Sequence, residues 1–149
     1  MILPAITDAD KAFLLHHLSK RIGEHPKFIV GDMPFNIVAC VRDARITAVV
    51  AFLNYRRESM EFHLAVDPGG IARSEIKALF AYPFEQIGVL RLWCLIRRNN
   101  KKAREGALRL GFKQTGMCPD EFGHRKDGVE YSMRRCDCRW LKQKDKDNG

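Results

Sequence analysis

The stretch that decides the fold is RNNKKAREGALRLGF, residues 98–112, which follows the apolar run VLRLWCLI at residues 89–96. The apolar run is rich enough in branched and aromatic residues to be an internal strand. The basic segment after it predicts a helix from Lys101 to Leu110 that ends at Gly111. A solvated surface helix would explain the charges, but it would require neither an asparagine pair at its start nor a strand on each side.

Two patterns of hydrophobic spacing alternate along the rest of the chain. A helix is predicted over residues 7–23, because Thr7 and Asp10 have the spacing of a capping box and an apolar face follows them. A second helix is predicted over residues 75–88, with Pro83 kinking or breaking it because proline has no backbone donor. Strands are predicted at residues 35–41, 45–55, 59–66, 113–117 and 129–135, the last two as a closing hairpin.

Length and composition predict one soluble globular domain. The 149 residues are 46% hydrophobic and 30% charged, which excludes a fibrous or wholly disordered chain. We place the domain at residues 1–140 and a disordered polar tail at residues 141–149. No apolar window spans a bilayer and no signal peptide is evident, so we expect a cytoplasmic protein without a membrane partner. The five cysteines predict no metal site, because they lack paired zinc-finger spacing.

The formal net charge of +8 indicates an anionic partner or merely a soluble surface. Basic side chains crowd together between Arg97 and Arg109. They fit a solvated helix face, a site for cofactor phosphates, or a nucleic-acid surface. Nucleic acid is the least favoured partner, because the aromatic side chains typical of such surfaces are not evident beside the cluster.

The segments LWCLIRRNNKKAREGALRLGFKQTG (92–116) and GVEYSMRR (128–135) resemble the C-terminal half of the GNAT N-acetyltransferases. They are most similar to the branch that acetylates ribosomal proteins, with Asn100 at the family's asparagine and Ala103 at its small residue. The resemblance covers roughly residues 35–135, and the short chain is also similar to bacteriophage-encoded members. It implies an α/β (α+β) fold with a mixed, mainly antiparallel sheet flanked by helices.

The resemblance implies an enzyme that moves the acetyl group of acetyl-CoA directly to an amine. The acceptor would be a protein N-terminus, a lysine or a small-molecule amine, and no metal would be needed. The alternative is a catalytically degenerate GNAT scaffold that binds nucleic acid or a host protein through its basic surface. A homodimer is a further expectation, and the identity of the acceptor stays open.

The segment DPGGIARS, residues 67–74, is expected to hold the diphosphate of the cofactor. Backbone N–H groups and the positive end of a helix dipole favour such an anion. Gly69 and Gly70 would let the backbone approach it, and Ser74 would cap the following helix. By resemblance this is the family's pyrophosphate loop, although it departs from the usual R/Q-x-x-G-x-G/A form. The expected cofactor-binding residues are Leu64, Ala65, Val66, Gly69, Gly70, Ile71, Ala72, Arg73, Ser74, Asn100, Lys102 and Ala103.

A catalytic base is expected on the strand MEFHLAV, because an amine must lose a proton before or during its attack on the thioester. Glu61 and His63 alternate onto one face of this strand. A glutamate near this place is the base in some GNAT enzymes, and a histidine ordinarily titrates near neutral pH. Both residues therefore stay candidates.

The residue that protonates the leaving thiolate is not identified. The position of the family's helix tyrosine is occupied by Ala107, and Tyr131 is expected to lie in the core because it alternates with other apolar residues of its strand. The resemblance implies that a strand N–H group near Ala65 or Val66 stabilises the oxyanion.

Two asparagines precede the basic helix, and we assign them different roles. Asn99 is expected to cap the helix, and Asn100 to hydrogen-bond the pantetheine arm of the cofactor. The segments 23–35 and 118–128 are expected to line the acceptor site. Their carboxylates would suit a cationic acceptor: Glu24, Asp120 and Glu121.

Overall fold

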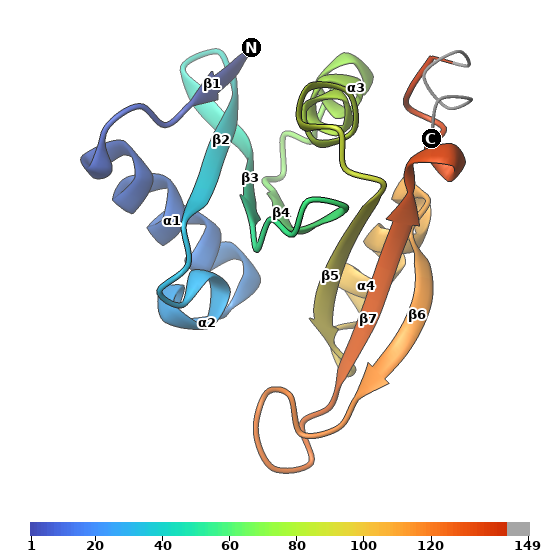
Figure 1. The fold of residues 1–149 in the computed structure, drawn as a ribbon. Coiled ribbons are helices and arrows are strands. Elements are labelled where there is room, and N and C mark those ends of the chain that lie inside the picture. Colours follow the sequence, from blue (N-terminus) through green and yellow to red (C-terminus); the bar gives the residue numbers. More distant parts are fainter. Residues whose placement is uncertain (143–149) are drawn as a thin grey trace.

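The computed structural model describes residues 1–142, which form one seven-stranded sheet with helices on both faces (Figure 1). The strand order is β1-β2-β3-β4-β5-β7-β6. The elements are β1 (Ile2–Pro4), α1 (Asp8–Ile22), α2 (Pro26–Val30), β2 (Phe35–Arg42), β3 (Arg45–Leu53), β4 (Ser59–Val66), α3 (Arg73–Ala81), a π-helical turn (Tyr82–Ile87), β5 (Arg91–Arg97), α4 (Lys101–Leu110), β6 (Lys113–Cys118), β7 (Gly128–Arg134) and a 3-10 turn (Arg135–Asp137).

The middle of the sheet departs from the antiparallel pattern of the rest. Within the described chain, β4 and β5 run parallel, while the other neighbouring strands are antiparallel. Residues 59–61 of β4 pair with residues 91–93 of β5, and the pairing then stops. β4 continues to Val66 against β3, and β5 continues to Arg97 against β7. The mixed, mainly antiparallel sheet is as predicted, and its two halves separate at one end.

Each face of the sheet has its own hydrophobic core. Leu14 and Leu18 of α1 pack on one face, where Ala65 of β4 also lies. Phe80 of α3 packs on the opposite face against Phe62 of β4, and α4 covers the same face beside β5 and β7 (Figure 1). Neighbouring residues of β4 therefore point to opposite cores, which confirms the predicted alternation along this strand.

The sequence predicted the cap of α1 correctly and the cap of α3 incorrectly. Thr7 and Asp10 form the predicted capping box of α1: the Thr7 hydroxyl accepts from Asp10 N at 3.1 Å, and the Asp10 carboxylate accepts from Thr7 N at 3.0 Å. The prediction that Ser74 caps α3 is wrong, because the cap position is Ala72. The Glu75 side chain instead accepts from Ala72 N. At Pro83 the helix changes into a π-helical turn, as its missing donor led us to expect.

Two short elements and the end of the domain differ from expectation. β1 and α2 are too short to show hydrophobic periodicity, and neither was predicted. Leu141, which we assigned to the polar tail, is buried in the core beside α3, and the remainder of that tail from residue 143 lies outside the described residues. In residues 1–142 no helix has the length and apolar character that a membrane span requires. All five cysteines are free thiols, and the described residues contain no cluster of three or more potential metal ligands.

Candidate functional site

The separation of β4 and β5 creates the central feature of the site. No main-chain pairing in the described chain joins residues 62–66 of β4 to residues 94–97 of β5. We call the opening between these two stretches the strand wedge. Backbone N–H and C=O groups on a strand edge pair readily with any extended chain laid beside them. Three expected cofactor residues, Leu64, Ala65 and Val66, lie on this edge.

A tight loop connects the end of β4 with the start of α3. Gly70 N donates to Asp67 O at 2.8 Å, and Gly70 has a φ of 74°. A Cβ atom at Gly70 would meet no atom within 4 Å, so the space beside this residue is open to a ligand. The first N–H groups of a helix have no acceptor inside it, and Arg73 and Ser74 are the first two residues of α3. The loop therefore presents free donors and a helix dipole to an anion beside the strand wedge.

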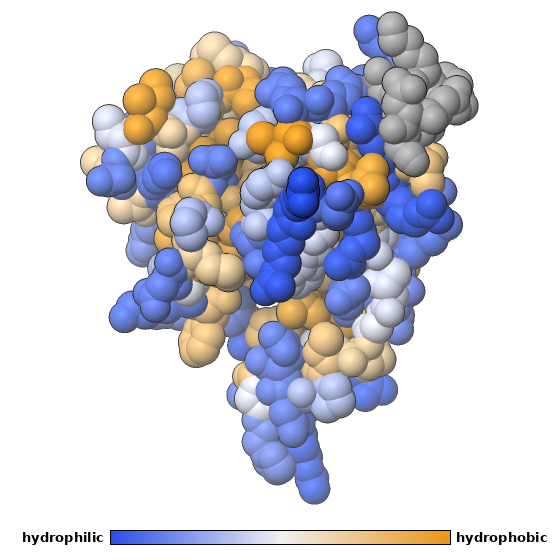
Figure 2. Space-filling view, in the orientation of Figure 1, coloured by the Kyte–Doolittle hydropathy of each residue, from blue (hydrophilic) through white to orange (hydrophobic). Residues whose placement is uncertain are grey.

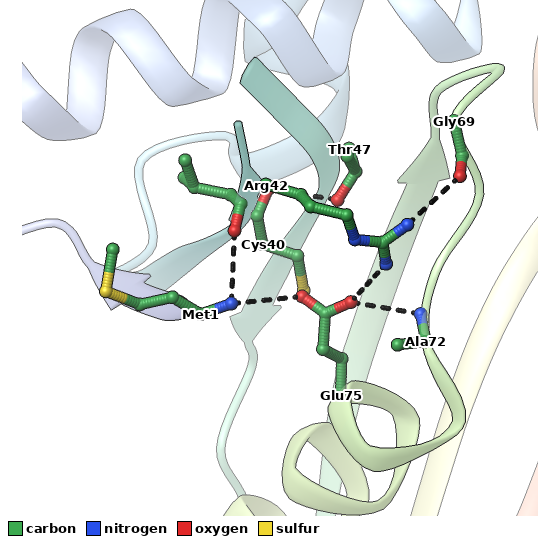
Figure 3. Close-up of polar contacts among 8 residues, drawn as sticks. Met1, Cys40, Arg42, Thr47, Gly69, Ala72 and Glu75 are labelled. Carbon is green, nitrogen blue, oxygen red and sulfur yellow. Dashed lines mark hydrogen bonds and ion pairs between the residues drawn. The ribbon is translucent and has the colours of Figure 1, made fainter. Parts of the chain in front are cut away.

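Glu75 holds this loop in place (Figure 3). One of its oxygens accepts from Ala72 N and from Arg42 Nη2, both at 3.0 Å. Arg42 also donates to Gly69 O at 3.4 Å, so two points of the loop are tied to one buried carboxylate. The terminal amino group of Met1 lies 3.6 Å from the other oxygen. The hydrogen bond from Ala72 N, followed by those from Arg42 and neighbouring groups, holds the pKa of Glu75 below its usual range.

Replacing Glu75 by glutamine should make the protein less stable at neutral pH and less sensitive to acid. Because the folded pKa lies below the unfolded value of ~4.3, the carboxylate stabilises the fold above that pH. This contribution is lost as the pH falls through the folded pKa. We expect a loss of about 1 kcal/mol in the free energy of unfolding at pH 7. Thermal unfolding of the variant and the wild type at pH 7 and pH 3 measures both effects. If the two proteins lose the same amount of stability between pH 7 and pH 3, the prediction is contradicted.

The helix after β5 is capped by the second asparagine of the pair. Asn100 Oδ1 accepts from Ala103 N at 3.1 Å, so the prediction that Asn99 is the cap is wrong. The Asn100 side-chain NH₂ group is left over from this bond and can still donate to a ligand. Lys102, another expected cofactor residue, is exposed in the first turn of the same helix.

Two substitutions at Asn100 separate its structural role from a role in binding. Asn100→Ala removes the cap and should lower the free energy of unfolding by ~0.5–2 kcal/mol. Asn100→Asp keeps the oxygen of the cap but removes the NH₂ donor. If this donor binds the pantetheine arm, the aspartate variant should keep its melting temperature and lose about threefold to tenfold in acetyl-CoA affinity. Unchanged affinity in the aspartate variant would show that Asn100 is only a cap; Asn99→Ala is the matched control.

The two candidate bases lie together where the strands begin to separate. His63 Nε2 is 3.3 Å from Glu61 Oε1, with the side chains 15% and 10% exposed. The two side chains are not oriented to form a hydrogen bond with each other. Nε2 of His63 has no other hydrogen-bond partner in the described part of the chain. Glu61 is opposite Trp93 in the last parallel pair. A carboxylate and an imidazole nitrogen without a hydrogen-bond partner thus lie beside the residues where the parallel pairing stops, and both groups are able to transfer a proton.

The tyrosine near the site is part of the core, as predicted. Tyr131 is 1% exposed, and its hydroxyl accepts from Arg104 Nε at 2.9 Å. Ala107, at the position of the family's tyrosine, is also buried. Neither residue presents an acidic group to the strand wedge.

Two of the carboxylates expected to receive a cationic acceptor have partners within the protein. Glu24, in the connection between α1 and α2, forms a two-pronged ion pair with Arg97 at the end of β5. Asp120 accepts from Arg125 N at 2.7 Å inside the loop between β6 and β7. The ion pair neutralises Glu24, whereas Asp120 binds a backbone N–H with one oxygen and keeps its charge.

Comparisons with known proteins agree on the fold. No protein-family model and no curated protein sequence matches the chain. A spermidine N-acetyltransferase from Vibrio cholerae in complex with CoA and spermine is 19% identical, with a TM-score of 0.67 over 95% of this chain and 98% of that one. A GNAT-family structure from Desulfovibrio desulfuricans is 14% identical, with a TM-score of 0.67 over 90% and 98% of the two chains. The ribosomal-protein-S5-alanine acetyltransferase from Vibrio fischeri is 17% identical, with a TM-score of 0.55 over 74% of this chain and 64% of that one.

The chain therefore has the GNAT fold, as its C-terminal sequence led us to expect. A structure of a ribosomal-protein acetyltransferase is among those that share it.

Proposed function

We propose that the protein is a cytoplasmic N-acetyltransferase that uses acetyl-CoA and transfers the acetyl group directly to an amine. The observation that carries the proposal is the strand wedge, whose free β4 edge leads into a loop and helix end suited to an anion. A structure with the same fold contains CoA and spermine, which supports this pairing of cofactor and amine. The acceptor class is a protein N-terminus, a lysine or a small-molecule amine.

The chain offers separate groups for each part of the cofactor. The edge of β4 at Leu64–Val66 would pair with the amide groups of the pantetheine arm. The N–H groups of Arg73 and Ser74, beside the open space at Gly70, would hold the diphosphate. Acetyl-CoA supplies an acetyl group activated as a thioester. An N–H group near Ala65 or Val66 would stabilise the negative charge that develops on its carbonyl oxygen.

Glu61 or His63 would accept the proton that the amine loses. Both groups are largely shielded from solvent, which strengthens their electrostatic effect on a bound ammonium group. For the leaving thiolate we assign solvent as the proton source, because Ala107 carries no acid and the Tyr131 hydroxyl is buried against Arg104.

Direct transfer is favoured over transfer through Cys94 of β5 or Cys40 of β2. Burial, with added effects of Glu61 and Glu130, raises the pKa of the Cys94 thiol to about 12. Burial also raises the pKa of Cys40, to about 11. A thiol with such a pKa is almost entirely protonated at neutral pH and is a poor nucleophile.

The proposal is tested by incubating the purified protein with acetyl-CoA labelled in the acetyl group and a panel of amines. The panel should contain spermidine, peptides with a free N-terminus and peptides with one lysine. We expect free CoA and an N-acetylated product to form in equal amounts, with kinetics that require both substrates to be bound together. Failure to transfer the label to this panel or to a cell lysate would favour the degenerate scaffold instead.

A further inference from the structure

We propose that the acceptor carries an acidic group, which binds in a basic pocket at the end of β5. This inference rests on the proposed function and names the class of its substrate. The pocket lies between the β5–α4 turn and the loop between β6 and β7, and its volume is about 340 Å³. It is lined by five cationic side chains, one amide and one carboxylate: Arg97, Arg98, Arg104, Arg125, Lys126, Asn99 and Asp127.

The positive charge of this pocket is only partly balanced from within the protein. Arg97 is paired with Glu24, and Arg98 lies 3.9 Å from Asp127. The other three cations form no ion pair with a carboxylate in residues 1–142: Arg104, Arg125 and Lys126. Arg104 donates to the Tyr131 hydroxyl and to a backbone carbonyl, both of which are neutral. The pocket is therefore left with a positive potential, to which the start of α4 adds its helix dipole.

Arg97, which lines the pocket, lies on the face of the sheet that carries Glu61. Leu92 and Cys94 of β5 point into the core beneath α3 and α4. Because side chains alternate along a strand, Trp93 and Arg97 point to the other face of the sheet. Glu61, which pairs with Trp93, points to that face as well. Arg97 is four residues beyond Trp93, the partner of Glu61, which corresponds to about 13 Å along a strand. An extended peptide covers this distance in about four residues. An amine at Glu61 and an acidic side chain in the pocket can thus belong to one acceptor.

Two segments expected to line the acceptor site meet at Arg97. Its guanidinium pairs with Glu24 from the α1–α2 connection and lies 4.7 Å from the centre of the Phe122 ring in the β6–β7 loop. That loop forms a hydrophilic projection at the lower end of the molecule (Figure 2). The guanidinium of Arg97 occupies one face of the Phe122 ring, which leaves less aromatic surface for stacking on a base and favours an acidic peptide over a nucleic acid. Arginine groups bind carboxylates in a planar, two-pronged manner, so the pocket suits aspartate or glutamate side chains.

The test uses three labelled peptides with a free N-terminus that differ only at the third to fifth residues. These three residues are all glutamate in the first peptide, all glutamine in the second and all lysine in the third. Fluorescence anisotropy with the full chain and saturating CoA should show the glutamate peptide binding at least about tenfold more tightly than the glutamine peptide, and the lysine peptide most weakly. The double variant Arg125→Glu/Lys126→Glu should lose this preference and keep its acetyl-CoA affinity. The matched control is Lys113→Glu, which changes a 75% exposed side chain at the other end of the hairpin.

Several outcomes would overturn the inference. Equal binding of the three peptides, or no binding, would show that the pocket does not select an acidic acceptor. Weaker acetyl-CoA binding in the double variant would assign the pocket to the phosphates of the cofactor. Tighter binding of a single-stranded oligonucleotide, lost in the double variant, would assign it to nucleic acid. Selective binding of the glutamate peptide without acetyl transfer to any amine would instead contradict the proposed function and leave the pocket's selectivity standing.

Discussion

Replacing Glu61 by glutamine is expected to lower kcat by about 10²–10⁴-fold and to leave acetyl-CoA affinity unchanged. The glutamine side chain has the same shape but cannot accept the proton of the amine. Because Glu61 is 3.3 Å from His63 Nε2, the variant also changes the electrostatic environment of the histidine. The measurements are initial rates over a range of pH and calorimetric titration of the variant with acetyl-CoA.

A parallel variant decides which of the two residues is the base. His63→Gln removes the imidazole and leaves the Glu61 carboxylate in place. If Glu61 is the base, the histidine variant should retain most of its kcat and shift its pH profile. If the large loss occurs in His63→Gln alone, the histidine is the base. Nearly full activity in both variants would contradict the assignment of proton transfer to this pair.

Replacing Gly70 by valine should weaken acetyl-CoA binding about tenfold to hundredfold and also destabilise the protein. The branched side chain would fill the open space beside the loop and separate a diphosphate from the first N–H groups of α3. The φ of 74° adds a backbone cost of about 1–2 kcal/mol for any residue with a Cβ atom. Calorimetric titration measures the first effect, and thermal unfolding without ligand measures the second.

The matched control for this variant is Gly88→Val. Gly88 has a φ of 90°, and a Cβ atom there would also meet no atom within 4 Å, but this glycine follows the π-helical turn, at the opposite end of α3 from the loop. Its replacement should cause a similar loss of stability and leave acetyl-CoA affinity unchanged. Equal losses of affinity in the two variants would show that the effect of Gly70→Val comes from general destabilisation.

The sequence predicted the fold well where a feature depends on neighbours in the chain. The capping box of Thr7 and Asp10, the alternation along β4 and the break at Pro83 are all set by residues within a few positions of one another. Short elements gave no such signal. α2 has five residues and β1 has three, so neither completes enough periods to be recognised.

The candidate site was predicted less completely, because its geometry depends on distant residues. The sequence placed Glu61 and His63 on one face of a strand, and the structure brings their side chains together. It could not show that Glu24 would pair with Arg97, 73 positions away, or that Glu75 would hold the loop through Arg42. The pairing with Arg97 neutralises Glu24, one of the carboxylates that we expected to receive a cationic acceptor.

The error at the start of α4 has a different cause. Either of two adjacent asparagines can cap a helix, and the choice depends on where the backbone leaves the strand. β5 ends at Arg97 and a turn follows, with Asn100 N donating to Arg97 O at 2.9 Å. This turn moves the cap to Asn100, one position beyond the residue that we had assigned.

Calorimetric titration of the wild-type protein with acetyl-CoA tests the central claim most directly. The strand wedge, the loop at Gly70 and the free N–H groups of α3 together predict one molecule bound per chain with a Kd of about micromolar order. Because the diphosphate should supply much of this affinity, acetyl-pantetheine, which lacks it, should bind far more weakly. Absence of binding at about 1 mM acetyl-CoA, corresponding to less than about 4 kcal/mol of binding free energy, would contradict the claim that this fold is used here to hold acetyl-CoA.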